Sequence, residues 1–145
     1  KLNADMVSLA TGPTDITPQN YTEGPYMVKR KGIYYMMYSA NHFAGENYAV
    51  GYATASSPLG PFRKAENNPI LQKNTNKGGN VSGTGHNSVT FSPDGSQMFC
   101  VYHGRTEASG KERVVFIDRM DAKNGKITVF GPTSSAQARP LSIKK

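Results

Sequence analysis

The feature that most constrains this chain is its series of short β-branched and aromatic runs, each broken by Gly, Pro, Asn or Asp. Such runs predict strands that end in turns. No stretch places apolar residues at i, i+3, i+4 and i+7 over three turns, the spacing of an amphipathic helix. Asp94-Gly95 and Asn124-Gly125 are dipeptides typical of tight hairpins. The pattern therefore predicts an all-β fold.

The predicted strands fall into two similar groups, at residues 21–72 and 85–132. GPYMVKRKGIYYMMYSA in the first group corresponds to GHNSVTFSPDGSQMFCVYHG in the second, at an offset of about 60 residues. Each group reads as four antiparallel strands, which is the pattern of a β-propeller blade. Residues 1–20 then form the end of a preceding blade and a linker, and residues 133–145 form a tail.

This chain is too short to form a closed propeller by itself. Propellers close with roughly 4–8 blades, and this chain supplies about two. Two open blades leave apolar faces and strand edges uncovered. We therefore expect the missing blades to come from a longer chain, from a second chain or from self-association.

The composition excludes several other classes of protein. The 145 residues carry a net charge of +7, but Lys and Arg are spread along the chain, so we predict no nucleic-acid partner. No run approaches the ~20 apolar residues of a membrane span, so no membrane partner is predicted. Cys100 is the single cysteine and lies in an apolar run, which predicts a buried, inert thiol.

Four stretches carry a resemblance to a known family: TEGPYMVKRKGIYYMMYSAN, YAVGYATASSPLGPF, GTGHNSVTFSPDGSQMFCVYHGR and RVVFIDRM. Together they resemble the C-terminal half of the catalytic domain of glycoside hydrolase family 43. That family includes β-xylosidases, α-L-arabinofuranosidases and arabinanases. The resemblance implies a five-bladed propeller that hydrolyses arabinose- or xylose-containing plant cell-wall saccharides with inversion, in xylan or arabinan degradation.

Glu23 is the candidate catalytic residue. It stands before Gly24 and Pro25 at the entrance of a predicted strand. Taken alone, this is also the pattern of a surface glutamate in a loop. The resemblance implies that Glu23 is the general acid, which protonates the oxygen of the leaving group. Gly24 lets the backbone turn at this point, and Pro25 fixes the entry into the strand.

The resemblance also implies ligand-binding residues. His86 corresponds to a histidine near the propeller axis that helps to hold a calcium or sodium ion, directly or through water. A hydrogen-bonded structural histidine is the alternative for His86. Arg119 is implied to contact the sugar, and an outward-facing arginine is the alternative. Asn41 and His42 follow a strand where the loop reaches the cleft rim, so we predict that they bind substrate.

One catalytic group is missing from the pattern. Inverting hydrolysis needs a base roughly 6.5–9.5 Å from the acid. In the family this base is an Asp of the first blade, and no Asp here stands in that context. We therefore expect this chain alone to be inactive. The alternatives are a non-catalytic carbohydrate-binding or assembly module of the same blades, and an unrelated propeller scaffold. A parent enzyme acting on polymers would be secreted or periplasmic.

Overall fold

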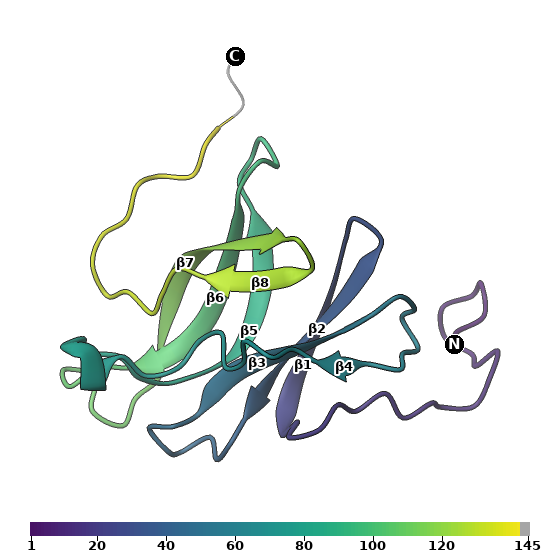
Figure 1. Cartoon of the computed structure of the whole chain (residues 1–145), viewed down its shortest axis with the longest axis horizontal. Helices are drawn as coiled ribbons and strands as arrows, with labels where there is room; N and C mark the ends of the chain where they lie inside the picture. The colour runs from purple at the N-terminus through teal and green to yellow at the C-terminus, as the bar shows by residue number, and fades with distance from the viewer. Residues whose placement is uncertain (143–145) are drawn as a thin grey trace.

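The computed structural model describes residues 1–142, and it consists of two four-stranded antiparallel sheets (Figure 1). The first sheet contains β1 (Glu23–Arg30), β2 (Ile33–Ala40), β3 (Ala49–Ala55) and β4 (Arg63–Lys64), in that order. The second contains β5 (Ser82–Phe91), β6 (Met98–Arg105), β7 (Val114–Lys123) and β8 (Lys126–Val129), also in order. A short 3-10 helix at Thr75–Lys77 lies in the connection from β4 to β5. The predicted all-β class is confirmed.

The turns form where the sequence predicts them. Asn124 and Gly125 join β7 to β8 with φ values of 52° and 76°, as a tight hairpin turn of this kind requires. Lys31 and Gly32 join β1 to β2 in the same way, with φ values of 47° and 82°. Asp94 lies in the longer connection between β5 and β6, where its carboxylate accepts hydrogen bonds from Ser92 and Ser96. These hydrogen bonds lower the pKa of Asp94.

The core lies between the two sheets. It is built from one face of each sheet, and the largest contributors are Tyr35, Met37, Val50, Tyr52, Leu71, Cys100, Tyr102, Met120 and Ile127. Hydrogen bonds also cross this interface. The hydroxyl of Tyr26 donates to the Val89 carbonyl at 3.1 Å, and the Ile127 amide donates to the Tyr52 hydroxyl at 3.1 Å. The two sheets therefore form one packed unit.

The opposite face of the second sheet is much less covered. Along β7, Phe116, Asp118 and Met120 are buried, whereas the side chains of Val115 and Ile117 are 72% and 52% exposed. The side chains of this strand thus alternate between its two faces, which leaves an apolar strip facing outwards.

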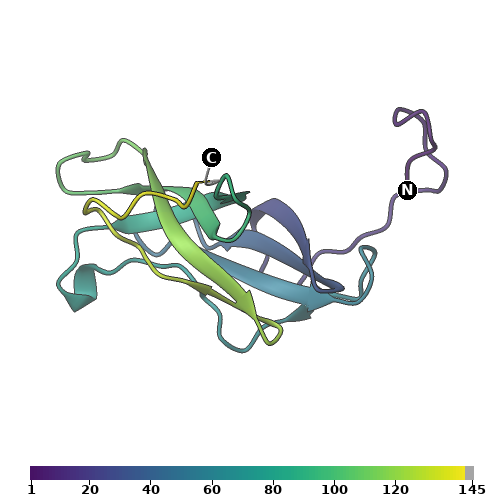
Figure 2. The same ribbon diagram turned by 90° about the horizontal axis from the view of Figure 1, so that it is seen from above.

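The ends of the chain lie outside the two sheets. Residues 1–22 form no strand beyond an isolated bridge between Leu2 and Leu9. The beginning of this segment extends away from the sheets in both views (Figures 1 and 2), whereas its end returns to the first sheet, where the Thr22 amide donates to the Ser39 carbonyl. Residues 143–145 of the expected tail lie outside the described residues. Within the described part of the chain, no helix is long and apolar enough to cross a membrane.

Cys100 provides a direct probe of the core. It is fully buried, and burial raises the pKa of its thiol to about 12. We expect the native protein at pH 8 to react with a thiol reagent such as Ellman's reagent roughly 10³-fold or more slowly than the urea-unfolded chain. Because this is the only cysteine, the labelling rate reports opening of the core between the sheets. Fast labelling without denaturant would contradict this packing.

Candidate active site

The local backbone brings Glu23 and His86 together. Glu23 begins β1 and is half-buried. Gly24 follows in the left-handed region with φ of 63°, and the pairing of β1 with β2 shifts register between Glu23 and Tyr26. A Cβ atom on Gly24 would lie 3.2 Å from the His86 ring. Glycine is therefore favoured here by its backbone conformation, and a side chain would also crowd the His86 ring.

His86 lies on the first strand of the second sheet. It also has a positive φ, 52°, and its amide donates a hydrogen bond to the Ser39 hydroxyl at 2.8 Å. Ser39 is fully buried and pairs with Glu23 across the first two strands. A polar bond between the sheets thus fixes the backbone of His86 next to Glu23, while its side chain stays exposed.

Tyr48 is the side chain that contacts the Glu23 carboxyl group. Its hydroxyl donates a hydrogen bond to Glu23 Oε1 at 2.8 Å, although the residue itself is fully buried. Burial, helped by the hydrogen bond and charge of Glu23 and opposed by Ser39 and Arg113, raises the pKa of Tyr48 to about 12. Tyr48 is therefore a neutral donor at neutral pH.

His103 packs against both Tyr48 and His86. Its ring stacks on Tyr48, with centroids 5.7 Å apart, and on His86, with centroids 6.4 Å apart. Both ring nitrogens are buried without a hydrogen-bond partner. Burial, together with the charges of Arg113, Arg105 and His86, lowers the pKa of His103 to about 4, against a small opposing effect of the Glu23 charge. His103 is thus a neutral aromatic surface at neutral pH.

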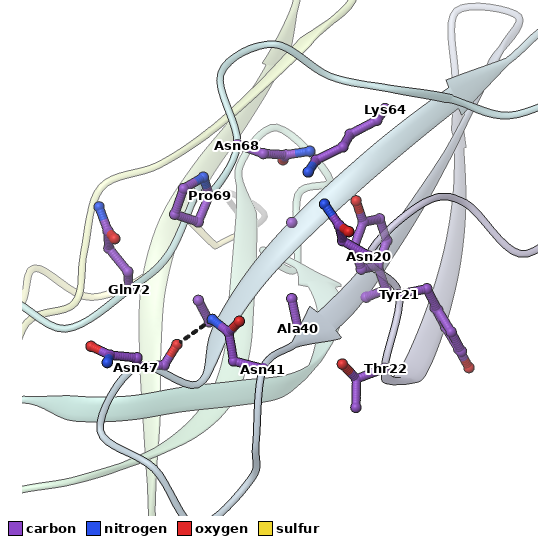
Figure 3. A pocket seen from close by; sticks show the side chains of 13 residues that line it. Asn20, Tyr21, Thr22, Ala40, Asn41, Asn47, Lys64, Asn68, Pro69 and Gln72 are labelled. Atoms are coloured by element: carbon purple, nitrogen blue, oxygen red, sulfur yellow. Dashed lines mark hydrogen bonds between the residues drawn. The ribbon is translucent and has the colours of Figure 1, made fainter.

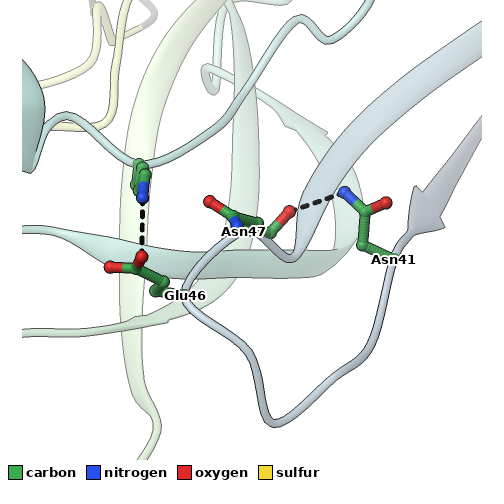
Figure 4. A network of polar contacts seen from close by, with 4 residues as sticks. Asn41, Glu46 and Asn47 are labelled. Carbon is green, nitrogen blue, oxygen red and sulfur yellow. Dashed lines mark hydrogen bonds and ion pairs between the residues drawn. The ribbon is translucent and has the colours of Figure 1, made fainter.

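The loop that delivers Tyr48 is tied at several points (Figure 4). The side-chain amide of Asn41 donates to the carbonyl of Asn47 at 2.7 Å, which closes the loop. Glu46 forms an ion pair with Lys73, with Nζ and Oε1 2.8 Å apart. One contact therefore joins two residues of the loop, and the other joins the loop to the connection between the sheets. Both lie close to Tyr48, which directly precedes β3.

Asn41 and His42, which the sequence predicts to bind substrate, directly follow β2. Asn41 lines a pocket of about 540 Å³ (Figure 3). The pocket is rich in polar side chains, namely Asn20, Thr22, Asn41, Asn47, Asn68 and Gln72. It also includes Ala40, the neighbour of Ser39, so it opens on the face of the sheet opposite to the one that Glu23 shares with Ser39. His42 is exposed and stacks on Phe43 with centroids 4.8 Å apart.

Arg119 is half-buried on the outward face of β7, opposite Phe99. The position opposite His103 is Val115, four residues or about 13 Å earlier on the strand. Arg113, just before β7, is the arginine whose charge acts on both Tyr48 and His103.

A bound ion would need more ligands than the described residues bring together. Among residues 1–142 there is no group of three or more His, Cys, Asp or Glu side chains that could hold a metal. Calcium also prefers oxygen ligands. His86 would therefore be at most one direct or water-mediated ligand, since the described residues gather no cluster of His, Cys, Asp or Glu around it.

Sequence reasoning missed Tyr48, Ser39 and Arg113. Tyr48 is one of eight tyrosines, and nothing in its neighbours sets it apart. Gly85 is the residue of the sequence that is tied to Tyr48, because a Cβ there would overlap the Tyr48 ring. This contact joins residues far apart in the chain, so it can be recognised only in the folded structure.

Comparison with known proteins identifies the family. Residues 1–127 match the profile of Glycosyl hydrolases family 43. A β-D-galactofuranosidase of Aspergillus niger is 46% identical over 122 residues, which are 83% of this chain and 34% of that protein. An extracellular exo-α-(1→5)-L-arabinofuranosidase of Streptomyces chartreusis is 33% identical over 109 residues, 72% of this chain and 33% of that protein. The chain belongs to glycoside hydrolase family 43.

A solved structure supports the same conclusion. The crystal structure of a thermostable family-43 glycoside hydrolase superposes with a TM-score of 0.85 at 44% identity, covering 98% of this chain and 49% of that one. The predicted resemblance and the propeller fold class are thus confirmed. The chain spans about a third of the length of these curated relatives and about half of that solved chain.

Proposed function

We propose that this chain is the acid-bearing part of a glycoside hydrolase that cleaves arabinose- or xylose-containing saccharides with inversion. Glu23 is the general acid. The observation that carries the proposal is the placement of its carboxyl group. It stands half-buried at the start of β1, with Oε1 engaged by the Tyr48 hydroxyl at 2.8 Å and with His86 beside it. A fixed, partly desolvated carboxyl group suits proton donation to a leaving group.

The contacts of the aspartates in this chain indicate where the catalytic base comes from. Asp5, Asp15 and Asp94 accept hydrogen bonds from their own turns. Asp118 is fully buried and Asp121 pairs with Lys123 at 2.7 Å. Each of these carboxylates is therefore already engaged in its own turn, in the core or in a surface ion pair. The base therefore comes from blades that this chain does not supply, in a longer chain, a second chain or another copy.

The substrate class and location follow the relatives. Those relatives are named as an arabinofuranosidase and a galactofuranosidase, and two Streptomyces relatives are named as extracellular. We propose a pentoside or furanoside substrate and a secreted or periplasmic enzyme. Arg119, Asn41 and His42 remain proposed sugar contacts, and His86 remains a proposed ligand of a calcium or sodium ion at the propeller axis.

The role of Glu23 is tested by hydrolysis. The purified chain is assayed alone and together with the remaining half of a family-43 propeller, on p-nitrophenyl α-L-arabinofuranoside, β-D-xyloside and β-D-galactofuranoside and on arabino- and xylo-oligosaccharides. We expect turnover only in the complete propeller. Glu23→Gln is expected to lower kcat on the oligosaccharides by at least about 100-fold, since general acids contribute factors of that order.

A matched control comes from Glu66, which is exposed and follows β4, at the edge of the first sheet opposite to β1. Glu66→Gln is expected to leave turnover unchanged. Full activity of Glu23→Gln would remove Glu23 as the acid. A complete, well-folded propeller that binds the oligosaccharides without cleaving them would instead favour the carbohydrate-binding module.

A further inference from the structure

We propose that Tyr48 is a positioning residue for Glu23, which holds one carboxyl oxygen and leaves the other to carry the proton. This inference rests on the proposed function of Glu23 as the acid. Tyr48 Oη donates to Glu23 Oε1 at 2.8 Å. Oε2 is therefore the oxygen available to a leaving group, and the hydrogen bond selects the rotamer in which it is presented.

The tyrosine ring is held so that it can act as a fixed support. One of its faces stacks on the His103 ring at an interplanar angle of 13°. Gly85 lies so close to the ring that a Cβ there would overlap Cε1 and Cδ1 and would lie 2.9 Å from Cζ. The ring is fully buried, and its loop is tied by the Asn41 and Glu46 contacts. The hydroxyl therefore has little freedom to follow a moving carboxyl group.

The chemistry gives this bond a second effect. In the cleavage step the Oε2–H bond breaks and the proton passes to the glycosidic oxygen. The anomeric C–O bond breaks with its electron pair moving to that oxygen, while a water molecule bonds to the anomeric carbon from the opposite face and gives its proton to the base of the other blades. The carboxyl group becomes a carboxylate as this happens. A hydrogen bond to a carboxylate is stronger than one to a neutral acid. The Tyr48 bond is thus tighter after proton transfer than before it, which favours the transition state.

The positioning effect can be measured on the chain itself, without activity. Side-chain three-bond couplings of Glu23, measured by NMR, report whether its χ1 angle occupies one rotamer or several. We expect a single rotamer in the wild type and averaged couplings in Tyr48→Phe, which removes only the hydroxyl. Unchanged couplings in Tyr48→Phe would overturn the proposal.

Tyr102→Phe is the matched control, because the Tyr102 hydroxyl also donates to a carboxylate, that of Asp118, at 2.6 Å. It removes the same kind of bond away from Glu23. We expect the Glu23 couplings to stay at their wild-type values in this variant. Averaging in both variants would mean that loosened packing, and not the Tyr48 hydroxyl, frees Glu23, and would also overturn the proposal.

A kinetic test separates the positioning role from the function on which it rests. In the complete propeller, aryl glycosides with poor leaving groups need the acid more than those with activated leaving groups. We expect Tyr48→Phe to lower kcat/KM by about 10- to 100-fold for poor leaving groups, as loss of a hydrogen bond to a charged group does. For activated leaving groups we expect a decrease of less than about 3-fold.

The two possible failures are distinguishable. If Glu23→Gln lowers the rate equally for all leaving groups, the acid assignment fails. If Glu23→Gln affects poor leaving groups selectively and Tyr48→Phe affects all leaving groups alike, the acid assignment holds and the positioning role of Tyr48 fails.

Discussion

Replacing Gly85 by alanine is expected to lower the free energy of unfolding by about 3 kcal/mol, the upper end for overpacking a core. The added methyl group would overlap the Tyr48 ring, which is fully buried and backed by His103. The ring cannot move without opening the stack and its bond to Glu23. For a chain of this size we expect the midpoint of thermal unfolding to fall by roughly 10 °C, as measured by circular dichroism.

A double-mutant cycle identifies the cause of this loss. In a Tyr48→Ala background the ring is absent, so Gly85→Ala is expected to cost less than about 1 kcal/mol more. Gly12→Ala is the matched control, because a Cβ at Gly12 meets no atom within 4 Å and its stability is expected to be unchanged. A full additional loss in the Tyr48→Ala background would show that the strain arises elsewhere than at the ring.

The fold was predictable because turns depend on local chemistry. Asn124-Gly125 indicates a hairpin by itself, since both positions need a positive φ that these residues tolerate. The alternation along β7 likewise separates buried Phe116 from exposed Val115. The order of strands in both sheets then follows from short connections between neighbours.

The site was predictable only in part, for a physical reason. Glu23 and His86 each stand next to a glycine: Gly24 has a positive φ, and Gly85 leaves room for the Tyr48 ring. Tyr48 carries no such mark, because its role depends on contacts with Gly85 and His103, which lie far along the chain. Asn41 follows Ala40 on β2, yet the pleat places the pocket that it lines on the face opposite to Glu23. Sequence position alone does not fix the face on which a loop residue lies.

Replacing Asp118 by asparagine is expected to lower the free energy of unfolding by about 3 kcal/mol, because a buried charge-assisted network would lose its acceptor. The carboxylate is fully buried. It accepts hydrogen bonds from the Tyr102 hydroxyl at 2.6 Å, from the Thr133 amide at 3.1 Å and from the Gln137 side chain at 2.7 Å, and also from the Thr133 hydroxyl. In asparagine, an NH₂ group replaces one of the two accepting oxygens, so a hydrogen-bond donor would face the donors of these residues.

The same change tests whether Asp118 anchors the segment after β8. Thr133 and Gln137 follow that strand, so loss of the anchor is expected to speed hydrogen exchange of the Thr133 amide by about 100-fold or more. Asp121→Asn is the control on the same strand: its carboxylate pairs with Lys123 at the surface, and such pairs contribute at most about 1 kcal/mol. If exchange at Thr133 were equally slow in both variants, the segment would be held by its other contacts. Faster exchange in Asp118→Asn alone would mean that one buried carboxylate joins the second sheet to the chain that leaves it.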